Sequence, residues 1–326
     1  MKILAVDDDP IIVELLAQFL ITLGPHELVT AQSGQEALEL VAQHDASPFD
    51  CFMLDIQMPQ MDGMQLARHL RRNPTYGITP IIMLTAMSEK RYIDGAFAAG
   101  ATDYVTKPFD LTELRARMNM VDQLVHTRKS QAIKQFSAST LLEGTDQPDR
   151  IDLHEPIALH DIHNVIACNA MENYVAQLSR SSLFGSTVFA LALRKADIHH
   201  ETLYGAEFKF LLEDVAEVIS DALSDRQLLM TYAGNGTFLC ITETGWRPEM
   251  NRVMDLVNLQ LSRAQIISNS GEELHPRVSA GIAIRLVWKS GEQILNSLSK
   301  AQSSAEDAAE EYERLKSDFF HSGKQA

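Results

Sequence analysis

Cysteines and long apolar runs are scarce in this sequence. The 326 residues include only three cysteines, Cys51, Cys168 and Cys240, which lie far apart and form no Cys-x-x-Cys pair. An odd number of isolated cysteines argues against a disulfide framework and favours reduced thiols in a cytoplasm. No apolar run approaches the roughly 18 residues that a membrane-spanning helix requires. The start, MKILAVDDDP, has too short an apolar core for a signal peptide, so we expect a cytoplasmic protein without a membrane segment.

Positive charge is also in short supply. The chain has 28 lysines and arginines against 44 aspartates and glutamates, which gives a net charge of −16. Because DNA binding needs clustered Lys and Arg side chains, this balance argues against a broad DNA-binding face, although it leaves room for a small basic patch. We find no recognition helix on a basic surface, so no DNA partner is expected. The length is sufficient for two domains and a connector.

Short apolar segments alternate with helical patterns over the first 125 residues. The predicted strands are residues 2–6, 27–30, 51–54, 81–84 and 103–105. The predicted helices start near residues 10, 33, 64, 88 and 110. Five strands alternating with five helices predict an α/β domain with a parallel sheet covered by helices on both faces.

Polar side chains stand directly after four of these strands. Asp7 and Asp8 follow the first strand and Asp55 follows the third, whereas Pro10 favours Asp9 as the N-cap of the next helix. The carboxyl ends of parallel strands meet at one edge of the sheet, where ligands bind. Carboxylates gathered there repel one another unless a cation lies among them, and Mg²⁺ prefers such oxygen ligands.

Thr85 follows the fourth strand and Lys107 follows the fifth. A nucleophilic carboxylate, a hydroxyl donor, an ammonium and Mg²⁺ are the groups that phosphoryl transfer to Asp55 requires. Each residue taken singly fits an ordinary polar loop as well. Their joint occurrence at the strand ends favours a phosphoacceptor site over that alternative.

The segments VDDDP, MLDIQMPQMDG, LTA and YVTKP carry a family resemblance. With their spacings, they make residues 1–125 resemble the receiver domain of two-component response regulators, which has a flavodoxin-like five-stranded parallel fold. The resemblance implies that Asp55 is the phosphoacceptor. It also implies a histidine kinase or a phosphotransfer protein as the partner that supplies the phosphoryl group.

The same resemblance implies the roles of the neighbouring residues. Mg²⁺ would be held by Asp8, Asp55 and the Gln57 carbonyl, with Asp7 acting through water. Thr85 and Tyr104 would form a switch pair, in which the hydroxyl moves toward the phosphoryl group and the ring turns inward; a half-buried strand aromatic is the alternative for Tyr104. The Lys107-Pro108 bond would be cis.

Gln57 and Met87 occupy two positions that vary in this family and tune the lifetime of the phosphoryl group. Met87 is apolar and would shield that group from water, so we predict slow autodephosphorylation. Replacement of Met87 by Glu should accelerate the decay of the aspartyl-phosphate, which a time course of label loss would measure. An unchanged decay rate would contradict the shielding role.

Residues 126–150 are predicted to connect two domains. The apolar period of the helix that Asp110 caps continues through Ile133 and Phe136 to Leu141. One interpretation is a single long helix, which in a homodimer would pair with a second chain. The other is a short helix followed by a separate link, before the turn-rich residues 143–149.

Residues 151–326 show a mixed pattern typical of a two-layer α+β domain. The predicted helices are residues 157–179, 207–223, 250–267 and 294–315, and the predicted strands are 188–193, 228–232, 238–242 and 277–284. In order and spacing, and in the segments TYAGNGTFLCI, VSAGIA and ILNSLSKAQSSAEDA, this half resembles a GGDEF domain, the diguanylate cyclase fold.

The acids that this family uses for catalysis are missing. The signature hairpin is occupied by residues 233–237, AGNGT, and the metal-binding end of the preceding strand reads ALRK at residues 192–195. Residues 224–227 lack the inhibitory Arg-x-x-Asp pattern. Without carboxylates nothing would hold the Mg²⁺ of a nucleotide. We therefore predict no cyclase activity and no nucleotide-binding residues; the hairpin would be a plain type I′ turn or a loop that binds another protein.

Several histidines are candidates for further sites. His160, in HDIHN, resembles the phosphoacceptor of histidine kinases, but a solvent-exposed helix end is the default interpretation. A metal site of His160 and His163 with His199 and His200 is weaker still, because such spacings are common.

The predicted function is that of a response regulator that signals through an inactive GGDEF-like domain to an unidentified protein partner or through dimer rearrangement. It would have no enzymatic activity beyond the receiver's own phosphorylation. The rival is an active or nucleotide-binding effector of cyclic di-GMP signalling.

Overall fold

The computed structural model describes residues 1–44, 46–86, 90–141, 151–159, 162–177, 185–203, 206–242, 245–287 and 291–322. The chain divides into two compact units, Met1–Asp146 and Gln147–Ala326. None of the helices in these ranges is both long and apolar enough to cross a bilayer.

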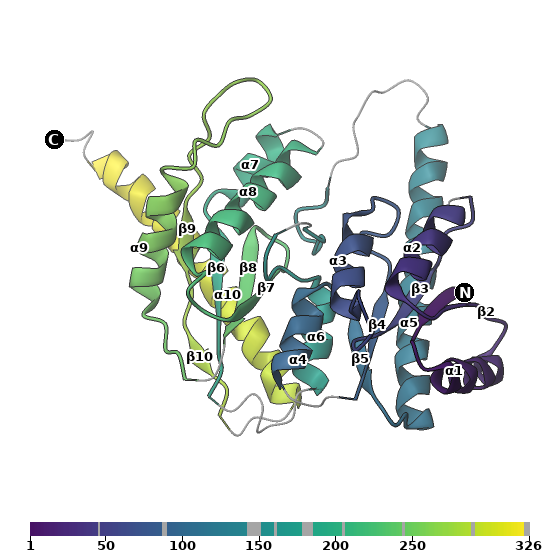
Figure 1. Ribbon diagram of the computed structural model, residues 1–326. Helices are drawn as coiled ribbons and strands as arrows, with labels where there is room; N and C mark the ends of the chain where they lie inside the picture. Colours follow the sequence, from purple (N-terminus) through teal and green to yellow (C-terminus); the bar gives the residue numbers. More distant parts are fainter. Residues whose placement is uncertain are drawn as a thin grey trace. The chain divides into compact units, whose positions relative to one another are not determined.

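The first unit is built on a five-stranded parallel sheet (Figure 1). Its strands are β1 (Lys2–Val6), β2 (Glu27–Ala31), β3 (Cys51–Asp55), β4 (Ile81–Thr85) and β5 (Asp103–Thr106). Their order in space is β2-β1-β3-β4-β5, and the four pairings are parallel. The predicted α/β class and strand boundaries are confirmed to within one residue.

Five helices connect and follow the strands. They are α1 (Pro10–Leu23), α2 (Gly34–Gln43), α3 (Gly63–Arg72), α4 (Lys90–Ala98) and α5 (Leu111–Leu141). Asp9 caps α1 as predicted, because its side chain accepts a hydrogen bond from the amide of Ile11. Ser88, near which the fourth helix is predicted to start, lies outside the described residues.

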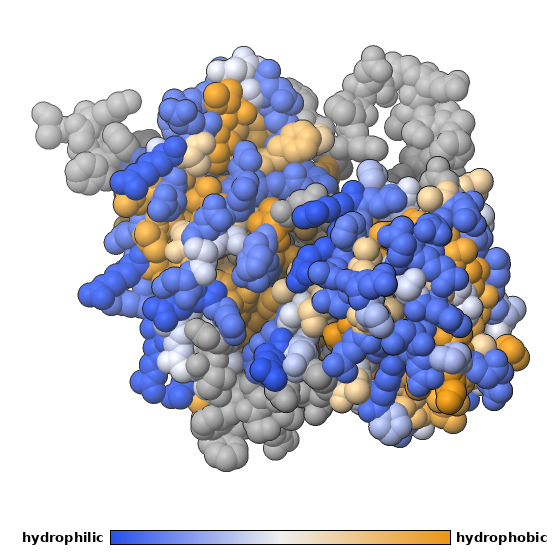
Figure 2. Space-filling view, in the orientation of Figure 1, coloured by the Kyte–Doolittle hydropathy of each residue, from blue (hydrophilic) through white to orange (hydrophobic). Residues whose placement is uncertain are grey.

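The sheet is apolar on both faces, which explains why its strands read as continuous hydrophobic runs. β3 and β4 are buried at every position, whereas the edge strand β2 is only partly covered. Hydrophobic residues reach the surface over α1 (Figure 2), where Ile11 and Ile21 are 75% and 77% exposed.

A buried carboxylate begins β5. Asp103 is 0% exposed, its Oδ1 accepts a hydrogen bond from the Tyr104 amide, and its Oδ2 lies 3.5 Å from Arg117 Nε. Burial raises the pKa of Asp103 to about 6, although the charge of Arg117 opposes that rise.

The difference in unfolding free energy between the Asp103→Asn variant and the wild type should depend on pH, because only the wild type has the carboxyl group with the raised pKa. The folded state holds the Asp103 proton more tightly than the unfolded state, so the wild type loses this stabilisation as the pH rises through about 6. The stability of the variant relative to the wild type should therefore increase by about 2 kcal/mol between pH 4 and pH 7. Urea unfolding at both pH values measures the difference.

Asp110→Asn is the matched control with the opposite sign. Hydrogen bonds from the amides of Glu113 and Thr112 hold the pKa of Asp110 below its usual range. The ionised Asp110 stabilises the folded state at a pH above the ordinary pKa of the group, and this stabilisation is lost in acid. The stability of Asp110→Asn relative to the wild type should therefore fall as the pH rises. A pH-independent difference for Asp103→Asn would contradict the assignment.

α5 continues without a break from Leu111 to Leu141. Of the two interpretations of the connector, the structure therefore has the long helix. Its buried stripe comprises Leu114, Met118, Val121 and Val125, which pack on the sheet. Pairing of its distal part with a second chain stays a prediction, because the side chains are described only up to Ser130.

The second unit is α+β, with an antiparallel sheet. Its strands are β6 (Thr187–Leu193), β7 (Leu228–Tyr232), β8 (Thr237–Thr242), β9 (Val278–Ala280) and β10 (Ile284–Arg285). They run in the order β10-β6-β8-β7, and β9 also pairs with β6. Its helices are α6 (Cys168–Gln177), α7 (Ala196–Thr202), α8 (Glu207–Ala222), α9 (Met250–Leu261) and α10 (Gly291–Ser322).

Three predicted boundaries in this unit are wrong. The helix predicted from residue 157 begins only at Cys168, because Val165 forms a parallel bridge with Met230 of β7. The amide of Met230 donates to the Asn164 carbonyl and that of Ile166 to the Met230 carbonyl. α9 ends at Leu261 instead of continuing to residue 267, and Gln265 then adopts a positive φ of 42°. This backbone conformation is incompatible with a continued helix.

The third error concerns the strand predicted at residues 277–284, which is interrupted. A Cβ atom at Gly281 would lie 2.7 Å from the amide nitrogen of Ala305 in α10. The glycine allows this close approach of helix and sheet, and the chain resumes as β10 only at Ile284.

Candidate functional site

The predicted site residues of the first unit gather at one edge of the sheet. Asp55 ends β3 and Thr85 ends β4, while Asp7 follows β1 and Lys107 follows β5. Because these strands are parallel and adjacent, their carboxyl ends meet. The amide of Lys107 also donates to the Thr85 carbonyl at 2.7 Å, which ties the loop after β5 to the end of β4.

Three carboxylates form a candidate metal centre at this edge. One oxygen each from Asp7, Asp8 and Asp55 lies within 4.8 Å of the others. Asp7 and Asp55 are buried and Asp8 is exposed, so the group opens to solvent on one side. Three acids at this spacing suit a divalent cation that keeps part of its water shell, and the residues therefore fit Mg²⁺.

The hydrogen bonds of Asp7 suggest how the three acids differ. Its Oδ1 accepts from the Asp9 amide at 3.1 Å and its Oδ2 accepts from Lys107 at 2.6 Å. Since both oxygens of Asp7 already have protein partners, Asp8 and Asp55 are better placed as direct ligands. Gln57, the third predicted ligand, is exposed beyond the end of β3.

Lys107 bridges two of the acids. Its Nζ donates to Asp7 Oδ2 at 2.6 Å and to Asp55 Oδ1 at 2.7 Å. Burial opposes the ammonium charge, but the hydrogen bonds and negative charges of Asp55 and Asp7 outweigh it and raise the pKa of Lys107. The side chain is therefore charged at neutral pH. The Lys107-Pro108 peptide bond is cis, as the resemblance implied.

The environment of Asp55 raises the pKa of its carboxyl group. Burial is the largest cause, and the charges of Asp7 and Asp8 add to it, whereas the hydrogen bond and charge of Lys107 act in the opposite direction. A cation among the three acids would favour the ionised form. A carboxylate in these surroundings is more basic than a solvated one, which suits a nucleophile.

The predicted switch residues are both buried. Thr85 is 1% and Tyr104 8% exposed. The Tyr104 ring packs edge-on against Phe97, with ring centroids 6.2 Å apart. The ring thus lies inward, and the roles of the pair in switching stay a prediction. Met87, predicted to tune phosphoryl lifetime, lies outside the described residues.

Gly63, at the start of α3, is a positioning residue to which the sequence alone assigned no role. A Cβ atom there would lie 2.1 Å from the Asp55 carbonyl oxygen, and the Gly63 amide donates to the Ile56 carbonyl at 3.1 Å. Asp62 caps α3 through the Gln65 amide. The Asp-Gly pair in the MDG segment was the available signal, because a glycine directly after a capping residue indicates a close backbone approach.

In the second unit, the β7–β8 hairpin, whose turn residues include no acid, is packed inside the domain. The Thr237 amide donates to the Gly234 carbonyl, and Asn235 and Gly236 between them have positive φ values of 51° and 70°, the signs that a type I′ turn requires. Gly234 and Gly236 are buried. A loop presented to another protein, the alternative weighed for this hairpin, therefore does not fit.

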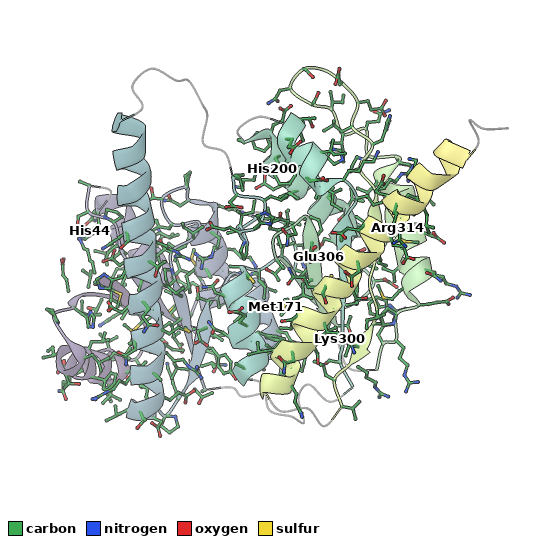
Figure 3. The ribbon with its side chains drawn as sticks, turned by 180° about the vertical axis from the view of Figure 1, so that it is seen from behind. His44, Met171, His200, Lys300, Glu306 and Arg314 are labelled. Carbon is green, nitrogen blue, oxygen red and sulfur yellow. The ribbon has the colours of Figure 1, made fainter. Side chains whose placement is uncertain are left out.

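Segments distant in sequence hold this hairpin. The Asn235 amide donates to the Leu153 carbonyl at 2.7 Å, and the Asn235 side chain lies 2.6 Å from His154 Nδ1. Glu306 of α10, labelled in Figure 3, accepts from the Thr237 hydroxyl at 3.2 Å. The turn is thus fixed from two sides.

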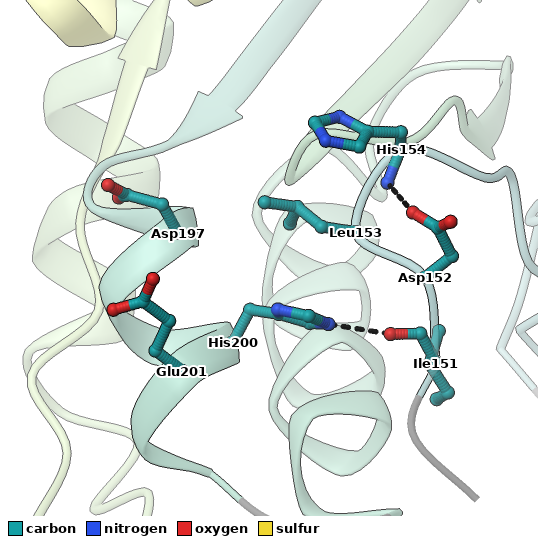
Figure 4. Close-up of a pocket in the computed structure, with 7 residues that line it drawn as sticks. All are labelled: Ile151, Asp152, Leu153, His154, Asp197, His200 and Glu201. Carbon is teal, nitrogen blue, oxygen red and sulfur yellow. Dashed lines mark hydrogen bonds between the residues drawn. The ribbon is translucent and has the colours of Figure 1, made fainter.

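A cavity of about 480 Å³ lies beside this hairpin (Figure 4). Its wall includes Asp152, Asp197 and Glu201, and His200 uses Nε2 to contact the Ile151 carbonyl at 2.6 Å. The histidine metal site, the weaker of the alternatives given above, includes His160, which lies outside the described ranges. Among the described residues, the acids of the first unit are the only grouping that could hold a metal ion.

The family match with known proteins falls within the first unit. Residues 3–119 match the family model of the response regulator receiver domain. The transcriptional regulatory protein CrdR of Helicobacter pylori is 37% identical over 117 residues, which are 36% of this chain and 53% of CrdR. SrrA of Staphylococcus aureus, also a transcriptional regulatory protein, is 35% identical over 174 residues, which are 53% of this chain and 64% of SrrA.

A solved structure of the chemotaxis protein CheY4 of Vibrio cholerae is 33% identical and covers 37% of this chain and 97% of its own, with a TM-score of 0.34. The chain thus spans 53% and 64% of the lengths of CrdR and SrrA. The matched residues include nearly all of the five-stranded sheet and the side chains of Asp7, Asp8, Asp55 and Lys107 at its carboxyl edge. Residues 3–119 of this chain form a response regulator receiver domain.

Proposed function

We propose that this protein is a two-component response regulator that accepts a phosphoryl group on Asp55 from a histidine kinase or a phosphotransfer protein. The observation that carries the proposal is the double ion pair of Lys107 with Asp7 and Asp55 beside a third acid, Asp8. This group combines a nucleophile, a fixed cation and a set of metal ligands. Exposed Ile11 at the start of α1 offers an apolar contact near the same edge for a protein donor.

The chemistry follows from these positions. A carboxylate oxygen of Asp55 attacks phosphorus as the bond to the donor's histidine nitrogen breaks, and that nitrogen keeps the electron pair. Lys107 then exchanges its contact with Asp55 for one with a phosphoryl oxygen, and Thr85 donates a hydrogen bond to another. Asp8, Asp55 and the Gln57 carbonyl would hold Mg²⁺, with Asp7 acting through water, and the ion would supply further charge neutralisation.

The test uses the full chain, Mg²⁺ and acetyl phosphate as a small donor. Intact-mass analysis should show one added phosphoryl group, which hydroxylamine removes because an acyl phosphate is labile to it. EDTA should prevent the addition. Failure of the chain to accept the group from any acyl phosphate or phosphohistidine donor would refute the proposal.

For the second unit we propose a degenerate GGDEF-like output domain that acts through protein contacts or dimer geometry. The α+β architecture and the central hairpin support this assignment. The end of β6 offers Leu193, Arg194 and Lys195 where a metal-dependent cyclase would need acids. Incubation with GTP and Mg²⁺ should give no cyclic di-GMP; product formation would establish the rival function.

Phosphorylation would shift one face of the receiver domain between two arrangements. α5 and the connector form the natural route by which this change reaches the second unit. Scattering and mass measurements with and without beryllofluoride, a phosphoryl mimic, should differ in assembly or in partner binding. Identical behaviour in both states would count against this output. The names of CrdR and SrrA raise DNA binding as the competing output, and a salt-dependent DNA shift would reveal it.

A further inference from the structure

A second cavity of the C-terminal unit, of about 530 Å³, has a different chemical character from the one beside the hairpin. It lies where the end of β6, α9, the start of β9 and the distal part of α10 come together, and these elements are neighbours in the fold (Figure 1). A volume of this size is within the range of small-molecule sites.

The wall of this cavity is cationic in a protein of net charge −16. It includes four basic side chains, those of Arg194, Lys195, Arg277 and Lys316. Only two carboxylates, Asp255 and Glu313, accompany them. The cavity beside the hairpin has the opposite composition, with the three carboxylates named above. This cavity therefore has more basic than acidic side chains in its wall, although the whole chain has more acidic than basic residues.

Arg194 is held in place without a carboxylate. Its Nε donates to the hydroxyl of buried Ser279 at 2.9 Å, and its guanidinium lies 3.5 Å from the centroid of the Tyr312 ring. Its Nη2 donates to Met254 Sδ at 3.8 Å. A cation held over an aromatic face keeps its other N–H donors, here those of Nη1, available to a ligand. The side chain is thus fixed before any ligand binds, which reduces the entropy lost on binding.

The other cations are only partly compensated. Lys195 lies 3.6 Å from Glu313. Arg277 donates to the Asn258 carbonyl, a neutral partner. Among the residues that the structure describes, neither Arg194, Arg277 nor Lys316 has a carboxylate within ion-pair distance. Uncompensated cations that converge on one hollow repel one another unless an anion joins them.

We propose that this cavity binds a small phosphate-bearing anion through direct contacts with Arg194, Arg277 and Lys316, without a metal ion. Arginine forks match phosphate oxygens in geometry as well as in charge. Met254 and Tyr312 supply an apolar wall for the organic part of such a molecule. The site goes beyond the phosphoacceptor chemistry of the receiver and does not depend on it.

The experiment uses the full chain in EDTA and inorganic pyrophosphate as the probe, with binding measured by calorimetry. EDTA removes Mg²⁺, so the acidic edge of the receiver cannot contribute. The wild type should bind one pyrophosphate. The double variant Arg277→Glu with Lys316→Glu should bind it at least tenfold more weakly, and both side chains are exposed, so the fold should be retained.

Lys300→Glu is the matched control, because Lys300 is another exposed lysine of α10, away from this cavity (Figure 3). Its affinity for pyrophosphate should stay within twofold of the wild type. Three results would each overturn the proposal: no binding by the wild type at millimolar pyrophosphate, undiminished binding by the double variant, or an equal loss in the control. None of them affects phosphoryl transfer to Asp55, so the two proposals fail independently.

Discussion

Replacement of Asp55 by Asn will abolish phosphoryl incorporation from acetyl phosphate. The amide has nearly the shape of the carboxylate but is not a nucleophile, so the attacking group is removed while the packing at the end of β3 is kept. Lys107 retains its 2.6 Å contact with Asp7. We expect a decrease in the phosphorylation rate of at least about 1000-fold, equivalent to about 4 kcal/mol in the activation barrier.

Asp9→Asn is the control for this variant. Asp9 is a neighbouring acid, but its carboxylate accepts from the Ile11 amide at 2.9 Å and caps α1. Asn is an equally good N-cap, so both stability and phosphorylation should be unchanged. Intact-mass time courses with both variants decide the assignment. Labelling that persists in Asp55→Asn, or that is lost in Asp9→Asn, would show that another carboxylate accepts the group.

The location of this site was predictable because two independent constraints agree. The central strands are buried on both faces, so they read as unbroken apolar runs, and each ends abruptly at a polar residue such as Asp55 or Thr85. The parallel direction of the strands then brings these polar ends to one edge of the sheet. Both inferences, where each strand ends and that the strand ends meet, need no knowledge of how side chains pack. The strand boundaries and the site residues therefore follow from the same sequence pattern.

The second unit was less predictable because its boundaries depend on contacts distant in sequence. Val165 and Ile166 are apolar and also fit a helix, but β7 has an unpaired strand edge and Val165 pairs with it instead. The close approach of α10 at Gly281 likewise interrupts a strand whose own sequence favours continuation. The packing of the hairpin against Leu153 and Glu306 has no local sequence signal.

Arg71 is another residue whose importance only the structure reveals. It lies in the last turn of α3, where a surface basic residue is the ordinary expectation. Its guanidinium instead donates to the carbonyls of Tyr76, Thr79 and Gly100, at 2.9, 2.7 and 2.6 Å. Burial, reinforced by the charge of Arg128, lowers the pKa of Arg71 to about 9, so the group still carries its charge at neutral pH and makes charge-assisted hydrogen bonds.

Replacement of Arg71 by Met should lower the free energy of unfolding by about 4 kcal/mol. The methionine keeps much of the apolar stem, but three carbonyls lose their donor, and hydrogen bonds to charged groups contribute about 1.5–3 kcal/mol each. Arg71→Lys should have an intermediate effect, because an ammonium cannot reproduce the planar fork. Arg68→Met, at an exposed position of α3, should change stability by less than about 0.5 kcal/mol. Urea unfolding of the three variants provides the measurement.

The Arg71→Met variant also tests whether the stability of the receiver domain and its phosphorylation at Asp55 depend on different residues. Tyr76 and Thr79 precede β4 and Gly100 precedes β5, so Arg71 ties together loops at the amino edge of the sheet, whereas Asp55 and Lys107 lie at the carboxyl edge. The folded fraction of Arg71→Met should therefore accept phosphoryl groups at the wild-type rate, although it unfolds at a lower urea concentration. Loss of phosphorylation at full stability would contradict this division, and so would a loss of less than about 1 kcal/mol in unfolding free energy.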